Sequence, residues 1–220
     1  MTLIQVYRTL YDSYGPQGWW PADSPFEIMI GAILTQNTAW SNVEKAINNL
    51  KGNNALSPDS IINTPHQQLA EWLLPSGYYN IKSERLKQFC HWYIKNGELE
   101  ALNKLATKPL RESLLQVKGI GPETADDILL YAFRRPVFVI DAYTRRLFLR
   151  LQLITGEEPY EKLRQYFESE LSDNDNIDKL FNEYHALIVM HAKQHCKKQP
   201  DCADCPLRSN CEVGSRLSDA

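Results

Sequence analysis

Hydrophobic residues recur along this chain at the three- and four-residue spacing that marks one face of an α-helix. The clearest stripe is formed by Val43, Ala46, Ile47 and Leu50, within the segment 37–50. Capping residues help to locate the first residue of several helices, because Ser or Asp before Pro is typical of the start of a helix. The pattern predicts helices over residues 26–36, 37–50, 64–73, 80–95, 110–117, 123–133, 142–151, 158–171 and 177–195.

Strand signals are scarce. The sequence Val-Phe-Val-Ile at residues 137–140 is a short extended apolar run, and the rest of the chain has helical periodicity. We therefore predict an all-α protein made of two helical domains. One is a six-helix domain over residues 25–135, and the other joins residues 1–24 to residues 136–220 and carries a metal centre.

Composition limits the class of protein. The chain has 220 residues, of which 43% are hydrophobic and 23% charged, as in ordinary globular proteins. It has no apolar stretch approaching the roughly 20 residues of a membrane span, and its first residues lack the features of a signal peptide. We expect a cytoplasmic protein with no membrane partner. The net charge of −3 excludes a bulk polycation but leaves room for a local basic face.

Four cysteines near the C-terminus, Cys196, Cys202, Cys205 and Cys211, are spaced C-x5-C-x2-C-x5-C. Thiolates at such short spacings hold iron–sulfur clusters, and tetrahedral zinc is the alternative occupant. A disulfide pairing fits poorly, because nothing else in the sequence indicates secretion. The spacing therefore predicts a metal centre.

A glycine-rich turn, Val-Lys-Gly-Ile-Gly-Pro, joins two predicted helices at residues 117–122. Gly119 and Gly121 permit a tight turn, and Pro122 suits the first position of the next helix. The free N–H groups of such a turn, together with the positive end of a helix, form an anion site suited to a DNA phosphate. A plain connection between two helices is the alternative. Lys118 in this turn and Arg145 further along are candidate local cations.

Two further features suit chemistry on a nucleobase. Asp141 ends the apolar run 137–140 at the start of a helix, where it is either an ordinary N-cap or an aimed carboxylate. Trp20 and Trp40 lie in polar turns, and their rings are either core residues or platforms on which a base stacks.

Taken together, residues 118–125 and 137–146 resemble the helix-hairpin-helix (HhH-GPD) superfamily of DNA glycosylases. The cysteine tail resembles the endonuclease III branch, which carries a 4Fe–4S cluster, although its first interval usually encloses six residues and here encloses five. Residues 31–38 and 74–82 are similar to 3-methyladenine DNA glycosylase III, which lacks the cysteine cluster. The resemblance covers the chain from about residue 19 to residue 211.

This resemblance implies roles for particular residues. Asp141 would be the catalytic carboxylate, and Trp20 and Trp40 would enclose the flipped base. Glu123 would stand where the bifunctional endonuclease III enzymes have a lysine, and Lys193 matches a lysine near the active site of the alkylpurine enzyme. The expected DNA contacts are Gln36, Asn37, Lys118, Gly119, Gly121 and Arg145, with Gln36 or Asn37 as the wedge that fills the gap left by the base. A 4Fe–4S cluster held by the four cysteines would be the cofactor.

We therefore expect a base excision repair enzyme that acts, as a monomer, on double-stranded DNA containing a damaged base. Without a lysine at position 123, it would hydrolyse the glycosidic bond of an alkylated purine with weak or absent lyase activity. Two alternatives stay open. One is a bifunctional endonuclease III-type enzyme for oxidised pyrimidines, with Lys118 as a substitute amine. The other is a non-catalytic module that binds damaged DNA.

Overall fold

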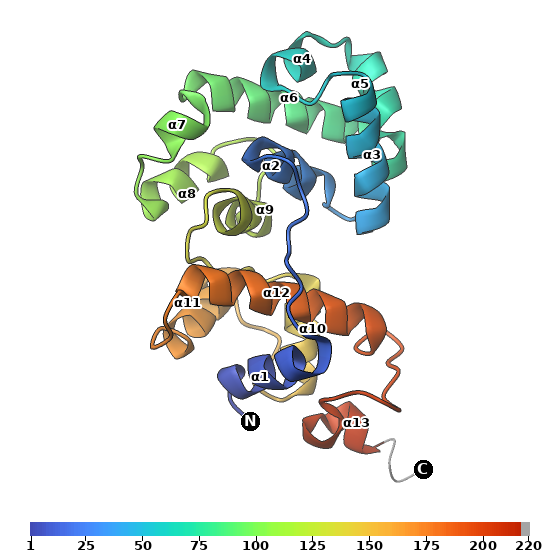
Figure 1. The fold of residues 1–220 in the computed structure, drawn as a ribbon, viewed down its shortest axis with the longest axis vertical. Helices are drawn as coiled ribbons and strands as arrows, with labels where there is room; N and C mark the ends of the chain where they lie inside the picture. The colour runs from blue at the N-terminus through green and yellow to red at the C-terminus, as the bar shows by residue number, and fades with distance from the viewer. Residues whose placement is uncertain (217–220) are drawn as a thin grey trace. The chain divides into compact units, whose positions relative to one another are not determined.

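The computed structural model describes residues 1–216, and every regular segment in that range is helical (Figure 1). The prediction of an all-α protein is thus confirmed. The chain forms two compact units, one made of residues 1–21 and 136–220 and the other of residues 22–135. A helix long and apolar enough to cross a membrane is not found among the described residues.

The unit of residues 22–135 is built around α2 (Pro25–Leu34), which packs against α3 (Trp40–Gly52), α6 (Tyr79–Lys95) and α9 (Pro122–Asp127). Residues 29–34 of α2 are all buried, as expected of a central helix that is apolar on every side. Its start has the predicted cap, because Ser24 accepts a hydrogen bond from the Glu27 amide and Pro25 follows directly. The other segments are α4 (Pro58–Asn63), α5 (His66–Leu73), η1 (Leu74–Ser76), α7 (Glu98–Leu102), α8 (Thr107–Leu115) and the π-helical η2 (Ile128–Ala132).

The helix predicted over residues 37–50 begins only at Trp40, so the predicted start was wrong. Residues 35–39 form a turn, here called the α2–α3 turn, and α3 begins at Trp40. Asn37 has a left-handed backbone with φ 54°, a conformation that asparagine tolerates better than most residues. Ala39 is extended and caps α3 without a side-chain bond. The consequence is that Asn37 stands exposed at the tip of a turn.

The second unit is organised by α12 (Ile177–Gln194), which packs against α1 (Leu3–Tyr14) and α10 (Ala142–Arg150) (Figure 1). An aromatic cluster fills its core. The ring of Phe138 lies 4.6 Å from that of Phe167, 5.2 Å from that of Phe181 and 5.7 Å from that of Tyr184. The remaining segments are α11 (Tyr160–Glu170), η3 (Arg208–Asn210) and α13 (Glu212–Arg216).

The apolar run at residues 137–140 is extended and fully buried but belongs to no sheet within residues 1–216. Buried backbone N–H groups need partners, and here side chains supply them. The amide of Phe138 donates to the Glu168 carboxylate at 3.0 Å, and the amide of Ile140 donates to the Tyr160 hydroxyl at 3.4 Å. Since these bonds fix the segment from α11, they also fix where the next residue, Asp141, emerges.

The buried lysine Lys82 gives a test of this packing. Burial lowers the pKa of Lys82 from 10.5 to about 8, with a smaller contribution from Arg85. Between these pH values the unfolded chain holds the proton and the folded chain does not, so folding stability rises with pH. The unfolding free energy of the wild type, measured relative to that of Lys82→Met, should therefore rise by about 1–3 kcal/mol from pH 8 to 10.5. Urea unfolding of both proteins at several pH values measures this change. A difference between them that stays constant with pH would contradict the lowered pKa of Lys82.

Candidate functional site

Asp141 is the N-cap of α10, and its two carboxylate oxygens have different partners. Oδ1 accepts a hydrogen bond from the Thr144 amide at 2.7 Å, which is the ordinary capping bond. Oδ2 lies 3.6 Å from Nε2 of His185, on α12. The side chain of Asp141 is 12% exposed and that of His185 8% exposed. Asp141 is therefore an N-cap whose second carboxylate oxygen lies near His185.

The surroundings keep this carboxylate ionised. Burial on its own would raise the pKa of Asp141, but the nearby His185 and then the Thr144 amide outweigh burial. The pKa of Asp141 therefore lies below its usual value, and the group is a carboxylate at neutral pH. Sequence reasoning missed His185, since a lone histidine on a helix carries no motif.

Two tryptophan rings and a lysine ammonium lie close together in the unit that contains Asp141. The rings of Trp19 and Trp20 are 5.5 Å apart and tilted by 50°. The Lys193 ammonium lies 5.9 Å from the centre of the Trp19 ring. Two residues predicted from the sequence, Trp20 and Lys193, are thus connected through Trp19, which was not predicted; the Trp19-Trp20 doublet was the available signal. Arg145 donates to the Glu158 carbonyl at 2.9 Å and so lies beside the loop before α11.

The predicted glycine hairpin is present in the other unit, as the turn of residues 117–121 between α8 and α9, here called the hairpin turn. Gly119 has φ 91°, which side chains rarely allow, whereas Gly121 is extended and caps α9. Lys118 and Gly121 are exposed, and so is Glu123 in the first turn of α9. The first residues of α9 are thus exposed at the position where the sequence predicts an anion site.

Gln36 is bound to the hairpin turn by its side-chain amide. Its Nε2 donates to the Gly119 carbonyl and to the Thr124 hydroxyl, both at 2.9 Å. Its Oε1 accepts a short hydrogen bond from Arg85, whose side chain also covers Gly119. Asn37, the alternative wedge, is exposed beside it. Trp40, at the start of α3, is partly exposed.

The two helices of the hairpin are held together by a buried ion pair that the sequence did not reveal. Arg111 on α8 donates twice to Asp126 on α9, at 2.6 and 3.0 Å. The Asp126 side chain is fully buried, and a bidentate pair of this kind fixes both distance and orientation. The hairpin turn therefore has a rigid base.

The four cysteine thiols line one small cavity, together with residues of α10 and α12. Arg150 on α10 donates to Sγ of Cys196 at 3.2 Å and to the Lys197 carbonyl at 2.8 Å, so it fixes the start of the cysteine loop. Among residues 1–216, no three His, Cys, Asp or Glu side chains are placed to hold a metal ion. A set of four thiol donors around one cavity has the chemistry that an iron–sulfur centre requires.

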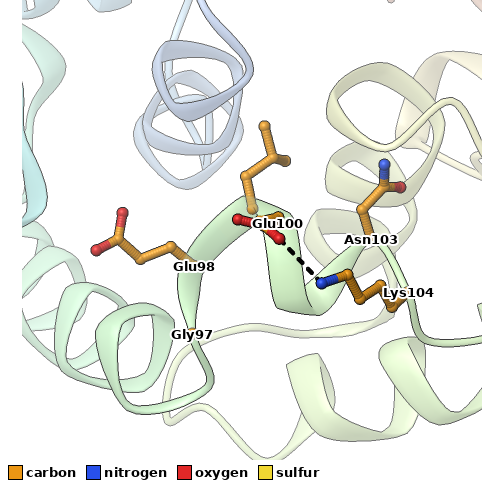
Figure 2. A pocket seen from close by; sticks show the side chains of 6 residues that line it. Gly97, Glu98, Glu100, Asn103 and Lys104 are labelled. Atoms are coloured by element: carbon orange, nitrogen blue, oxygen red, sulfur yellow. Dashed lines mark hydrogen bonds and ion pairs between the residues drawn. The ribbon is translucent and has the colours of Figure 1, made fainter.

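A larger open pocket, of about 780 Å³, lies at α7 and is lined by none of the predicted site residues. Figure 2 shows that it is bordered by Glu98, Glu100, Asn103 and Lys104, with Glu100 and Lys104 paired at 2.9 Å. Its acidic lining is unsuited to a phosphate backbone, so we do not place the chemistry there.

Comparisons with known proteins identify the family of the chain. A family model described as "HhH-GPD superfamily base excision DNA repair protein" matches residues 30–172. The chain is 44% identical to a putative DNA repair glycosylase of Methanocaldococcus jannaschii, covering 95% of each chain.

Two solved structures are also similar. The H. pylori 3-methyladenine DNA glycosylase, bound to 1,N6-ethenoadenine, is 31% identical with a TM-score of 0.78, over 88% of this chain and 98% of that one. An endonuclease III–DNA complex has a TM-score of 0.82 at 21% identity and covers all of both chains, which shows a shared fold.

The two hairpin glycines should respond differently to alanine. Gly119→Ala places a side chain at φ 91° and against Arg85, so it should lower the unfolding free energy by about 1–3 kcal/mol. Gly121→Ala meets nothing within 4 Å and should change it by less than about 0.5 kcal/mol. Denaturant melts of the two variants compare them, and equal losses would contradict the hairpin geometry.

Proposed function

The chain belongs to the HhH-GPD superfamily of base excision DNA repair proteins, and from this premise we propose that it is a monofunctional DNA glycosylase for an alkylated purine. The main support for the proposal is the environment of the Asp141 carboxylate. This group is buried, accepts the capping bond from the Thr144 amide and lies near His185, in a unit that also contains Trp19 and Lys193.

Glycosidic hydrolysis makes use of such a carboxylate. As the C–N bond to the base breaks, positive charge develops on the sugar. An ionised group beside it stabilises that charge or takes a proton from the attacking water. Asp141 is suited to both roles, because its pKa is held low and its position is fixed by the Thr144 amide. In this proposal Asp141 is the catalytic residue and His185 positions it.

The residues of the hairpin favour base removal without strand cleavage. A lyase needs an amine that forms a Schiff base with the sugar, and the first turn of α9 offers the carboxylate Glu123 instead. The exposed Lys118 is the amine that remains in the hairpin turn. An alkylated purine suits this chemistry, since a cationic base leaves readily and gains from aromatic faces. We propose base-binding roles for Trp20 and Lys193 in one unit and for Trp40 and Glu123 in the other.

DNA contacts are proposed for the exposed elements of the hairpin unit. The amides near Gly119 and Gly121, with Lys118, would bind phosphates. Asn37 is favoured over Gln36 as the wedge, because the Gln36 amide is already bound to the hairpin turn. Arg145, in the other unit, would add a phosphate contact.

We propose that Cys196, Cys202, Cys205 and Cys211 hold a 4Fe–4S cluster, which makes residues 1–24 and 136–220 an iron–sulfur domain. The thiols line one cavity, and Arg150 donates to one of them, as expected where thiolate charge must be balanced. When bound, the cluster would tie the cysteine loop to α10 and α12 and so contribute folding energy. The chemistry on the base does not require it.

The proposal is tested with duplexes that each contain one defined lesion: 3-methyladenine, ethenoadenine, hypoxanthine, uracil or thymine glycol. We expect release of an alkylated purine, with strand breaks only after alkali. Asp141→Asn should slow release about 10²–10⁴-fold. It should stay folded and bind DNA, because asparagine caps helices as well as aspartate does.

Strand breaks at thymine glycol without alkali would instead establish the endonuclease III type of activity. Lys118→Ala then tests whether the hairpin lysine is the nucleophile, since nicking should stop if it is. DNA binding with no base released from any lesion would favour the non-catalytic alternative.

The metal centre has its own test. Protein purified without oxygen should contain about four iron and four sulfide per chain and show broad visible absorption. Cys202→Ser should reduce both contents and lower the melting temperature, whereas Cys90→Ser, at a buried cysteine in the other unit, should keep them. Stoichiometric zinc without iron would contradict the assignment.

A further inference from the structure

Lys82, on α6, is a fully buried cation without a carboxylate partner among the described residues. Its side chain is among the largest fully buried ones, with 1% of the residue exposed. The ammonium donates to two backbone carbonyls, that of Leu34 at 2.8 Å and that of Ser76 at 2.7 Å. Burying a cation is costly, so both carbonyls must be held close for the ammonium to remain there.

The two carbonyls belong to different turns. Leu34 ends α2 and leads into the α2–α3 turn, whereas Ser76 ends η1 and leads into Gly77 and Tyr78, here called the η1–α6 turn. Thr38 adds a second connection, because its hydroxyl donates a short hydrogen bond to the same Ser76 carbonyl. Lys82 and Thr38 therefore join two turns that are about forty residues apart in sequence.

Both turns present unusual, exposed residues. Asn37 and Tyr78 have left-handed backbones, with φ 54° and φ 48°, and the Tyr78 residue is 67% exposed. Leu74, Tyr79 and Ile81, close to Tyr78 in sequence, are also exposed, and an exposed aromatic ring can stack on a nucleobase. Gln36 also bonds to the hairpin turn, for which phosphate contacts are proposed above. The three turns thus belong to one connected network in this unit.

We propose that Lys82 is a positioning residue for DNA binding, whose buried ammonium holds the α2–α3 turn and the η1–α6 turn in register so that Asn37 and Tyr78 engage one duplex. This inference rests on the DNA glycosylase function proposed above. Lys82 itself does not touch DNA, because it is buried. Replacing Lys82 removes the ammonium that joins the Leu34 and Ser76 carbonyls, so the two turns can then move independently.

The experiment compares Lys82→Met with a matched control, Lys87→Met. Lys87 also lies on α6, and its ammonium also donates to two carbonyls, those of Ile62 and Thr64, at the junction of α4 and α5. Both variants remove bonds from an ammonium to two carbonyls, but Lys82 is fully buried and Lys87 half-buried, so the change in melting temperature is measured beside the change in affinity. We measure melting temperature, affinity for undamaged duplex DNA, and base release over a range of DNA concentrations.

We expect Lys82→Met to weaken DNA binding about tenfold and to raise the half-saturating DNA concentration equally, with the maximal rate changed less than about threefold. Lys87→Met should bind DNA like the wild type. Equal affinity in the two variants, or a loss of rate without a loss of affinity, would overturn the proposal. Affinity for undamaged DNA does not depend on base release, so a failure of the glycosylase assignment stays distinguishable.

A second variant covers the case in which Lys82→Met does not fold. Thr38→Val removes the other connection with little change of volume and should weaken DNA binding by a smaller factor, about twofold to fivefold. In Thr38→Val the backbone amides of both turns should exchange hydrogen faster than in the wild type, whereas the amides of α4 and α5 should exchange at the wild-type rate. Unchanged exchange and unchanged affinity in Thr38→Val would count against the proposal.

Discussion

Buried irregular backbone must find hydrogen-bond partners, and in this protein side chains supply them next to Asp141, Asn37 and the hairpin turn. Within residues 1–216 the extended run 137–140 has no neighbouring strand, and Glu168 and Tyr160 accept from its amides. The carbonyls of Leu34 and Ser76 accept from Lys82, and the carbonyl of Gly119 accepts from Gln36. These bonds set where the helices stop and where the exposed turns begin.

The same constraint explains why Asp141 is suited to chemistry. A carboxylate at the end of a fixed, buried segment cannot move away, and its capping bond occupies one oxygen while the other faces His185. The burial that would raise its pKa is outweighed by these partners. In the proposed mechanism this gives an ionised group at a defined position, as stabilisation of a developing positive charge requires.

The sequence predicted nine of the helices because they carry strong periodicity and good caps, as at Ser24 and Pro25. It gave no range for α1 or for the short helices α4, α7 and α13. It also indicated the glycine hairpin and the cysteine loop, whose spacings are local. It failed at the start of α3, because a left-handed Asn37 interrupts the helix without changing the apolar pattern. It did not reveal the contacts of His185, Lys82 or the Arg111–Asp126 pair, since these contacts depend on how separate segments pack.

The central claim is that an ionised Asp141, kept so by His185, removes the base. The most direct measurement is the pH dependence of single-turnover base release in wild type and in His185→Asn, at saturating DNA. Because His185 opposes the effect of burial on Asp141, its loss should move the acid limb of the profile to higher pH and leave the rate at neutral pH less affected. Identical acid limbs in the two proteins would contradict the account.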